Sequence, residues 1–158
     1  MKYRRITGAD DAIMAEIVRS NLKARQLDIP GTAYFDESLG HLSEYYNGVE
    51  KRFYYVVTDE AGTVLGGGGL AEFTQINNCA ELQKLYIADA IKGKGIGRRL
   101  MELIEEKARE YGYDKMYLET HTNLTEAIHL YEKMGYKLIE KPEGVVHATM
   151  NRFYIKEL

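Results

Sequence analysis

The sequence predicts a mixed α/β fold, an α+β arrangement of strands and helices around one sheet. Adjacent strand patterns over residues 52–73 indicate a β-hairpin, and strand, helix and strand patterns follow one another after residue 79. The chain has 158 residues, of which 45% are hydrophobic and 28% are charged. This is enough for one well-buried core and too short for two ordinary domains, so we expect a single domain over residues 1–158.

Composition and charge argue against several classes of protein. The N-terminal stretch MKYRRITGADDA turns polar at once, so it predicts neither a signal peptide nor a membrane span. One cysteine, Cys79, cannot form an internal disulfide, which favours a cytoplasmic setting. The formal net charge of −3 argues against nucleic acid as the main partner and leans toward a cationic one.

The first part of the chain predicts one short strand and two helices. Residues 3–6 fit a strand. Asp10 and Asp11 are typical helix-start residues, and the helix should stop before Pro30. Its apolar stripe is Ile13, Met14, Ile17, Val18 and Leu22. A second, shorter helix is expected from about Asp36, with an apolar face of Leu39, Leu42 and Tyr46.

The middle of the chain predicts three strands. Residues 52–59 and 63–73 form the hairpin, with Gly62 in its turn. Glycines 66–69 lie inside the second strand with no helix after them, so they indicate a bend or a close backbone contact. A third strand over residues 79–88 leads directly into another glycine-rich stretch.

The last part of the chain predicts helices alternating with strands. A strong helix ends at Gly112 and carries one apolar stripe: Ile96, Leu100, Leu103, Ile104 and Ala108. The elements expected after it are a strand over residues 115–120, a helix over 123–134, and strands over 136–140 and about 147–158.

The stretch IKGKGIG, residues 91–97, lies between a strand and a helix, where free backbone N–H groups and the helix dipole attract anions. It fails the nucleoside triphosphate pattern because Arg98 follows Gly97 where a lysine is required. It fails the dinucleotide pattern because Arg98 also replaces the third glycine. A different diphosphate ligand is therefore expected, surrounded by the cations Lys92, Lys94, Arg98 and Arg99.

Two motifs in this part of the chain resemble those of the GNAT superfamily of N-acetyltransferases. Residues 92–97, KGKGIG, are similar to the family's [Q/R]-x-x-G-x-[G/A] motif between its fourth strand and third helix, with Lys92 in place of Gln or Arg. The family's A-x-x-L-Y-x-x-x-G-[FY] motif is matched by Ala127, Leu130, Tyr131, Gly135 and Tyr136. The two motifs come in the family's order and spacing.

The resemblance implies a GNAT-like fold: a mostly antiparallel sheet of six to seven strands with one splayed parallel pair, and about four helices. It also implies acetyl-CoA, with the diphosphate at the glycine loop and the pantetheine arm along residues 82–87. The broken alternation of residues 85–87 indicates a bulge or burial on both faces. The implied cofactor contacts are Leu85, Tyr86, Ile87, Lys92, Gly93, Lys94, Gly95, Ile96, Gly97, Arg98 and Asn123. Asn123 followed by Glu126 is equally a helix N-cap pattern, and the two roles do not exclude one another.

Acetyl transfer to an amine needs a base, because a protonated alkylamine is not a nucleophile, and the departing thiolate benefits from a proton donor. The resemblance implies Tyr131 as the donor, while a core tyrosine is the alternative. It implies Glu81, in AEL at the start of a strand, as the base, with an ordinary strand-end carboxylate as the alternative. Glu119, His121 and water are the other candidates for the base.

The resemblance implies an acceptor that is a small-molecule or peptide amine, near Glu119 and near Tyr34 and Phe35, for which a place in the core is the alternative. The four histidines and one cysteine show no metal-ligand spacing, so no metal is expected. The resemblance is compatible with a homodimer. Two other functions stay open: a transferase of the same fold with another acyl-CoA or a non-amine acceptor, and a non-catalytic CoA-binding module.

Overall fold

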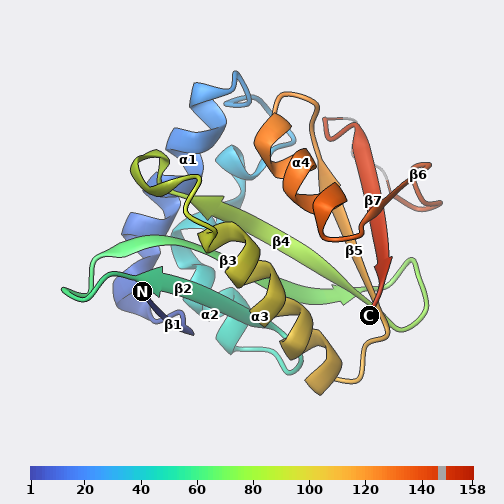
Figure 1. Cartoon of the computed structure of the whole chain (residues 1–158), viewed down its shortest axis with the longest axis horizontal. Helices are drawn as coiled ribbons and strands as arrows, with labels where there is room; N and C mark the ends of the chain where they lie inside the picture. The colour runs from blue at the N-terminus through green and yellow to red at the C-terminus, as the bar shows by residue number, and fades with distance from the viewer. Residues whose placement is uncertain (146–148) are drawn as a thin grey trace.

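The computed structural model describes residues 1–145 and 149–158, which form one seven-stranded mixed sheet (Figure 1). The strands follow the order β1-β2-β3-β4-β5-β7-β6, and every neighbouring pair is antiparallel except β4 and β5, which are parallel. This confirms the predicted sheet. The strands are β1 (Lys2–Arg5), β2 (Phe53–Thr58), β3 (Val64–Phe73), β4 (Cys79–Ile87), β5 (Lys115–Thr120), β6 (Lys137–Ile139) and β7 (Arg152–Glu157).

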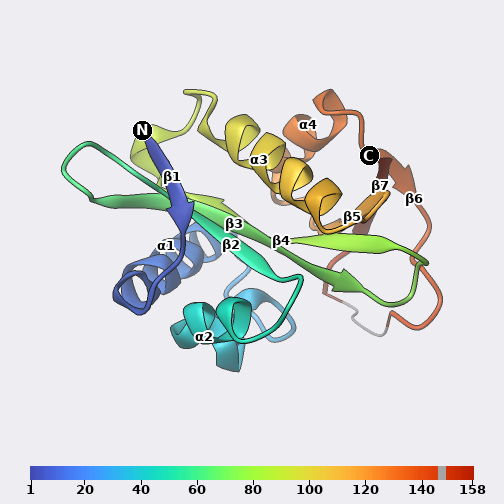
Figure 2. The same cartoon turned by 90° about the horizontal axis from the view of Figure 1, so that it is seen from below.

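In the described ranges, four α-helices cover the sheet, two on each face (Figure 2). The helices α1 and α2 lie on one face, and α3 and α4 lie on the other. Their bounds are α1 (Asp11–Ala24), α2 (Leu42–Asn47), α3 (Ile96–Glu110) and α4 (Thr125–Lys133). Short 3-10 turns flank them at Gly8–Asp10, Ala33–Phe35, Glu37–His41 and Asp89–Ile91.

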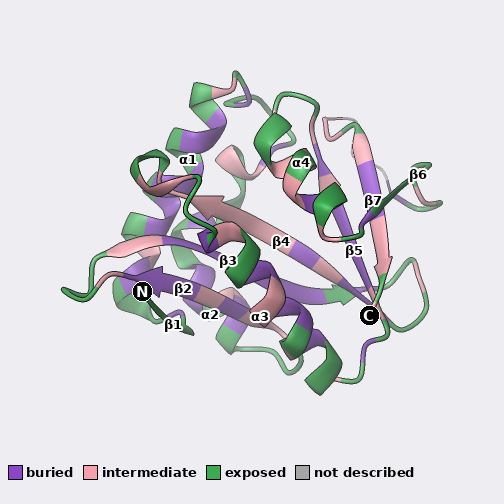
Figure 3. Cartoon of the chain, viewed as in Figure 1, coloured by how far each residue is buried: buried purple, intermediate pink, exposed green. Residues whose placement is uncertain are grey.

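Each face of the sheet has its own hydrophobic core, and buried residues occur along the strands and on part of each helix (Figure 3). The core under α1 and α2 includes Met14, Val18, Leu22, Tyr46 and Tyr54. The core under α3 and α4 includes Leu70, Ala80, Leu82, Met101, Ile104, Leu118 and Tyr131. Because side chains alternate along a strand, Ala80 and Leu82 place their neighbour Glu81 on the α1 and α2 face.

Helix α3 follows four of the five residues of the predicted apolar stripe. Ile96, Leu100, Ile104 and Ala108 recur at steps of four residues and are all buried, so one face of the helix packs on the sheet, whereas the predicted Leu103 is only half-buried. The chain leaves the helix at Gly112, whose φ of 90° lies in the left-handed region that favours glycine. The predicted end of this helix at Gly112 is confirmed, since Gly112 directly follows the C-cap residue Tyr111.

Strand β4 is irregular on both of its edges. Its register with β3 shifts between Gly67 and Gly69, and Lys84 has a φ of 48°, so the predicted bulge is present just before Leu85. On the other edge, β4 and β5 pair only at Cys79 with Lys115, Ala80 with Met116, and Glu81 with Tyr117. Within these two fully described strands, no residue after Glu81 pairs across, so the parallel strands part.

The glycine run 66–69 in β3 meets its neighbours closely, as predicted. A Cβ on Gly67 would lie 2.5 Å from Tyr54 Cε1 and 2.5 Å from the Tyr55 carbonyl oxygen. A Cβ on Gly69 would lie 2.6 Å from Tyr54 Cδ2 and 3.2 Å from Tyr46 Cε1. The absence of side chains at Gly67 and Gly69 therefore allows the rings of Tyr46 and Tyr54 to pack directly on the backbone of β3.

Several predicted boundaries are wrong. The second helix does not start as an α-helix at Asp36: a 3-10 turn at Glu37–His41 precedes the six-residue α2. Helix α4 begins at Thr125, with Leu124 and not Asn123 at the N-cap position, and the backbone N–H of Asn123 donates to His121 Nδ1. The first strand lies one residue earlier than predicted, and β6 covers only Lys137–Ile139. The last strand begins at Arg152, and residues 147 and 148 of its predicted range lie outside the described residues.

No helix in the described ranges combines the length and the apolar character that crossing a membrane requires.

Candidate active site between two parted strands

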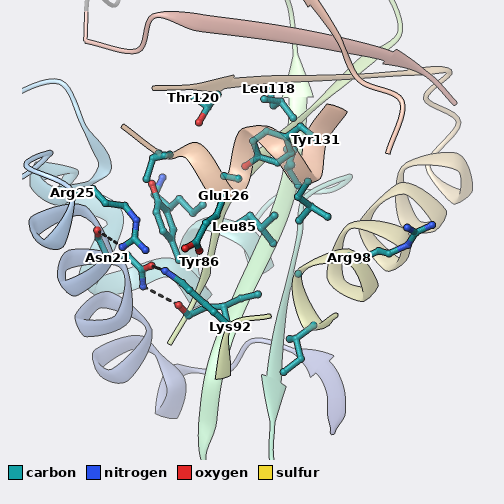
Figure 4. Close-up of a pocket in the computed structure, with 18 of the residues that line it drawn as sticks. Asn21, Arg25, Leu85, Tyr86, Lys92, Arg98, Leu118, Thr120, Glu126 and Tyr131 are labelled. Carbon is teal, nitrogen blue, oxygen red and sulfur yellow. Dashed lines mark hydrogen bonds between the residues drawn. The ribbon is translucent and has the colours of Figure 1, made fainter. Parts of the chain in front are cut away.

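A cavity of about 540 Å³ lies where β4 and β5 separate (Figure 4). Its walls come from the second half of β4, the glycine loop, the end of β5 and the first turns of α4. Asn21 and Arg25 from the end of α1 close one side. Because β4 has no partner on its β5-facing edge after Glu81, the backbone groups of this edge are free to bind an extended ligand in place of a strand.

The glycine loop connects β4 to α3 at one end of the cavity. Gly93 and Gly95 both have a φ of 78°, and Gly95 occupies the N-cap position of the 15-residue helix α3. A Cβ at either position would meet nothing within 4 Å, so these glycines are needed for backbone conformation and not for space. The loop places the positive end of the α3 dipole and its unpaired N–H groups beside the cavity.

Lys92 is held in the cavity wall by two side chains. Its Nζ lies 2.6 Å from Asn21 Oδ1 and 2.5 Å from Asp89 Oδ1. Asn21 also donates to the Ile87 carbonyl at 3.0 Å, so one buried side chain ties α1 to both the end of β4 and the loop. Arg25 reaches the same Asp89 oxygen at 3.4 Å. The hydrogen bond from Lys92 holds the pKa of Asp89 below its usual value.

Glu81 lies at the other end of the opening. It pairs with Tyr117 as the last residue of β4 in register with β5, and its Oε2 accepts a 3.0 Å hydrogen bond from Gln83 Nε2. Burial raises the pKa of this carboxyl to about 7, against the opposing effect of the Gln83 hydrogen bond, and nearby Glu119 adds to the rise. A carboxyl with this pKa exchanges protons near neutrality.

Glu119 is a second carboxyl near the same point. It follows Tyr117 by two residues on β5, so both side chains share the face of the sheet under α1 and α2. Tyr117 Oη donates to Glu119 Oε2 at 2.9 Å, and the Tyr117 ring stacks on Phe73 with centroids 3.9 Å apart. Glu119 lines the cavity, whereas Glu81 stands just outside it, where the two strands meet.

Tyr131 extends from α4 into the cavity wall, and Figure 4 shows its hydroxyl end directed into the space between the strands. The side chain is only 6% exposed, and burial raises the pKa of the phenol above its usual value. Tyr131 is therefore a neutral hydroxyl at physiological pH and can act as a proton donor.

Thr120, the last residue of β5, has a buried hydroxyl without a hydrogen-bond partner among the described residues. The residue is 2% exposed and lines the cavity, and Figure 4 shows its oxygen on the cavity side. A buried hydroxyl without a partner costs free energy, so this atom is suited to a ligand that brings a polar group to it.

The structure gathers most of the sequence-predicted residues around the cavity. Those that line it are Leu85, Tyr86, Ile87, Lys92, Gly93, Gly95, Ile96, Gly97, Arg98, Glu119 and Tyr131. Those that do not are Glu81, Lys94, Asn123, Tyr34 and Phe35.

Asn123 and the two aromatic residues belong to the surroundings of the cavity. Asn123 Nδ2 donates to the Arg25 carbonyl at 3.0 Å, which joins the β5–α4 connection to the end of α1. Tyr34 and Phe35 lie in the 3-10 turn after α1 with ring centroids 5.0 Å apart, and Phe35 is 58% exposed. The ion pair between Asp36 and Lys84, at 3.0 Å, fastens this segment to the bulge of β4.

Sequence reasoning missed the polar cavity residues that come from α1, Asn21 and Arg25. Asn21 and Arg25 lie about 70 residues before the glycine loop and in no motif with it. One signal was present in the sequence, since Asn21 is a polar residue within the otherwise apolar face of α1. In the described part of the chain, no three His, Cys, Asp or Glu side chains are arranged to hold a metal ion.

An opened parallel strand pair, with a glycine loop and helix N-terminus at one end and a buried carboxyl at the other, fits a class of protein, the acyltransferases. The chain belongs to the acetyltransferase (GNAT) family, whose model matches residues 12–136. It is therefore an acyltransferase. A protein of Escherichia coli (strain K12) called "Uncharacterized N-acetyltransferase YjgM" is 37% identical over 158 residues, covering 98% of this chain and 93% of that protein.

Solved structures show the same fold at low sequence identity. A GNAT-family acetyltransferase from Staphylococcus aureus Mu50 matches with a TM-score of 0.87 at 19% identity, over 99% of this chain and 98% of that one. The putative acetyltransferase yncA from Salmonella typhimurium, solved with its cofactor acetyl-CoA, matches with a TM-score of 0.76 at 20% identity, over 99% of this chain and 93% of that one.

Proposed function

We propose that residues 1–158 form a single acetyltransferase domain that moves the acetyl group of acetyl-CoA directly to a primary amine of a small molecule or peptide. The observation that carries this proposal is the opening between β4 and β5, which has the glycine loop at one end and Glu81 at the other. The loop fits a diphosphate, and the proton-exchanging carboxyl fits an amine that must lose a proton.

The residues of the cavity fit acetyl-CoA in three respects. The loop at Gly93 and Gly95 presents a helix N-terminus to the diphosphate, with Lys92 and Arg25 close by. The unpaired edge of β4 offers backbone partners to the amides of a pantetheine arm. The orphan hydroxyl of Thr120 offers one more hydrogen bond inside the opening. When bound, acetyl-CoA supplies an activated acetyl thioester.

Glu81 is proposed as the base. An alkylammonium with an ordinary pKa near 10 must be deprotonated before it can attack. With a pKa of about 7, Glu81 is ionised in about half of the molecules at pH 7, and it holds a proton better than an ordinary glutamate does. Glu119 is the second candidate because it lines the cavity itself.

Tyr131 is proposed as the proton donor to the departing thiolate. It lies on the side of the opening opposite β4, and its phenol stays neutral at physiological pH. Asn123 is proposed to help hold the pantetheine arm once its bond to the Arg25 carbonyl opens. The loop residues Lys94 and Ile96 and the arginine Arg98 are proposed to complete the diphosphate site.

The amine is proposed to arrive from the α1 and α2 face. Glu81 and Glu119 both lie on this face, and Tyr34 and Phe35 stand at its margin. Two neighbouring carboxyls favour a cationic acceptor, because a positive charge relieves their mutual repulsion. The buried thiol of Cys79 is a poor nucleophile because burial raises its pKa to about 12, so no covalent acyl-enzyme is proposed on this residue. A free cysteine is also compatible with the proposed cytoplasmic location.

The proposal is tested with a panel of acceptors, in which thiol release from acetyl-CoA is measured with polyamines, amino acids, and peptides with a free N-terminus or lysine. We expect release with at least one amine. Parallel reactions with propionyl-CoA and with alcohols of matching shape identify a transferase of other specificity. If acetyl-CoA binds while no acceptor releases thiol, the chain is a CoA-binding module and the proposal fails.

A further inference from the structure

A buried tyrosine and a glutamine stand behind Glu81 in an unbroken line of hydrogen bonds. Tyr46 of α2 is fully buried, and its Oη donates to Gln83 Oε1 at 2.7 Å. The other end of the same amide, Gln83 Nε2, donates to Glu81 Oε2 at 3.0 Å. Each polar atom of the Gln83 side chain is thus engaged by one partner, which fixes which end of the amide faces the carboxyl.

The fold makes room for this line at the glycine run of β3. Gly69 pairs with Gln83, and a Cβ on Gly69 would lie only 3.2 Å from the Tyr46 ring. The neighbouring Tyr54 packs on the same glycine run, and its Oη donates to the Lys84 carbonyl at 2.7 Å. Because glycines 66–69 have no side chains, two core tyrosines reach β4. Tyr46 contacts the Gln83 side chain, and Tyr54 contacts the Lys84 carbonyl at the bulge.

We propose that Gln83 and Tyr46 are positioning residues for the acceptor side of the active site: Tyr46 fixes Gln83, and Gln83 holds the Glu81 carboxylate in the orientation that receives the proton of the amine. This inference rests on the proposed function. Its two residues touch neither ligand, and they act only through Glu81.

The line of hydrogen bonds is not a path for the proton. Tyr46 is 0% exposed and belongs to the core of α1, α2, β2 and β3, so the line ends inside the protein. A glutamine amide between two oxygens also has no proton to exchange at neutral pH. The proton must leave Glu81 toward the cavity. The hydrogen bonds from Tyr46 and Gln83 orient the Glu81 carboxylate and stabilise its ionised form.

The charged and titrating neighbours of Glu81 lie on β4, β5 and α2, while its partner on β3 is the uncharged Ala71. Glu119 on β5 raises its pKa, and Lys84 on β4 lowers it. Tyr117 on β5, Cys79 on β4 and Tyr46 on α2 are also close enough to be influenced by its charge. Gln83 donates to the carboxyl, and a donor stabilises the ionised form, so this residue opposes the effect of burial.

The test is a titration of the Glu81 carboxyl by NMR in protein labelled with ¹³C at the glutamate carboxyl, with the signal assigned from Glu81→Gln. Gln83→Met removes the donor and keeps the length of the side chain, and Tyr46→Phe removes only the hydroxyl that fixes Gln83. We expect the pKa of Glu81 to rise in both, by about one unit in Gln83→Met because a hydrogen bond to a charged group is lost. Tyr54→Phe is the matched control, because it removes the hydroxyl of an equally buried tyrosine that donates to the Lys84 carbonyl and not to Gln83. The pKa of Glu81 should be unchanged in this variant.

The second readout is the pH dependence of kcat/KM with any amine that supports turnover. The acidic limb should move to higher pH in step with the NMR value, with a loss of about fivefold at pH 7 in Gln83→Met. If the Glu81 titration coincides in wild type, Tyr46→Phe and Gln83→Met, the inference is wrong, whatever the activity. If the titration moves while no amine is acetylated, the positioning stands and the proposed function fails. Tyr46→Phe keeps the test decisive if Gln83→Met does not fold.

Discussion

Glu81 on β4 and Tyr117 on β5 form the last residue pair before the two parallel strands part. One step further along β4, Leu82 already lines the cavity. The strand pairing therefore places Glu81 at the closed end of the opening between β4 and β5. A ligand that extends to this end of the cavity can contact its carboxyl.

The first prediction concerns the acidic limb of the pH–rate profile. The base must be ionised, so kcat/KM of the wild type should rise with pH through about 7, the pKa to which burial raises Glu81. Glu81→Gln should lose this limb and fall at least about a hundredfold at pH 8, a usual contribution of general base catalysis. The profile is measured from pH 5 to pH 9.

Glu119→Gln is the matched control for this prediction, since it neutralises the other carboxyl of the same face. It should keep the limb and shift it to lower pH, because Glu119 raises the pKa of Glu81. A Glu81→Gln enzyme with an unchanged acidic limb would assign the base to another group.

The second prediction concerns stability. The pKa of Glu81 is raised in the folded state, so the folded protein holds this proton more tightly than the unfolded chain does. The stabilisation is complete below the ordinary glutamate pKa and is lost as the pH rises through about 7. The glutamine in Glu81→Gln has no titrating proton, so its stability lacks this pH dependence. The Tm of Glu81→Gln minus the Tm of the wild type should therefore increase from pH 5 to pH 8. A Tm difference that stays constant over this range would show that Glu81 has an ordinary pKa.

The third prediction separates chemistry from binding at Tyr131. Tyr131→Phe keeps the ring that packs in the core of α3 and α4 and removes only the hydroxyl. We expect kcat to fall about ten- to a hundredfold while the Kd for CoA, measured by calorimetry, changes by less than about twofold. Equal losses in kcat and CoA affinity would make Tyr131 a binding residue.

The fourth prediction concerns the glycine loop. Gly95→Ala and Gly62→Ala each put a Cβ on a residue with positive φ and open space around it. Each should lower the free energy of unfolding by about 1 kcal/mol, because only the backbone conformation is penalised. Only Gly95→Ala should also weaken acetyl-CoA binding, since Gly62 lies in the β2–β3 turn. Equal affinities in the two variants would remove the loop from the site.

The fifth prediction gives Thr120 opposite effects on folding and binding. Thr120→Val keeps the shape and deletes a buried hydroxyl that has no partner among the described residues. The free energy of unfolding should rise by about 1 kcal/mol, because an unsatisfied polar atom is removed. The affinity for acetyl-CoA should fall, whereas Thr120→Ser should retain it. Unfolding in urea and calorimetry measure the two effects, and a stabilised variant with undiminished affinity would contradict the role.

The fold was predictable where the pattern is local. The apolar stripe of α3 and the glycine that ends the helix lie within one short stretch of sequence. The broken alternation that marks the β4 bulge is equally local. The short helix α2 was less predictable, because six residues carry too little periodic signal to separate an α-helix from the 3-10 turn before it. The start of α4 was predicted two residues early, because Asn123 lies in the turn before the helix, where its backbone N–H donates to His121 Nδ1.

The candidate site was predictable only where it lies in one segment. The loop and Tyr131 belong to motifs, so their residues could be named from the sequence. Asn21 and Arg25 reach the cavity because α1 packs against β4, and Gln83 meets Tyr46 because the glycine run leaves space for the ring. These contacts join parts of the chain about 40 to 70 residues apart, and only the folded sheet brings them together.

The most direct test of direct acetyl transfer follows one turnover by mass spectrometry, with the protein and acetyl-CoA first mixed alone and an active amine added afterwards. We predict that the protein gains no acetyl mass in the first step, and that each thiol released in the second is matched by one N-acetylated amine. An acetylated protein that then acetylates the amine, or thiol release without an N-acetyl product, would contradict the account.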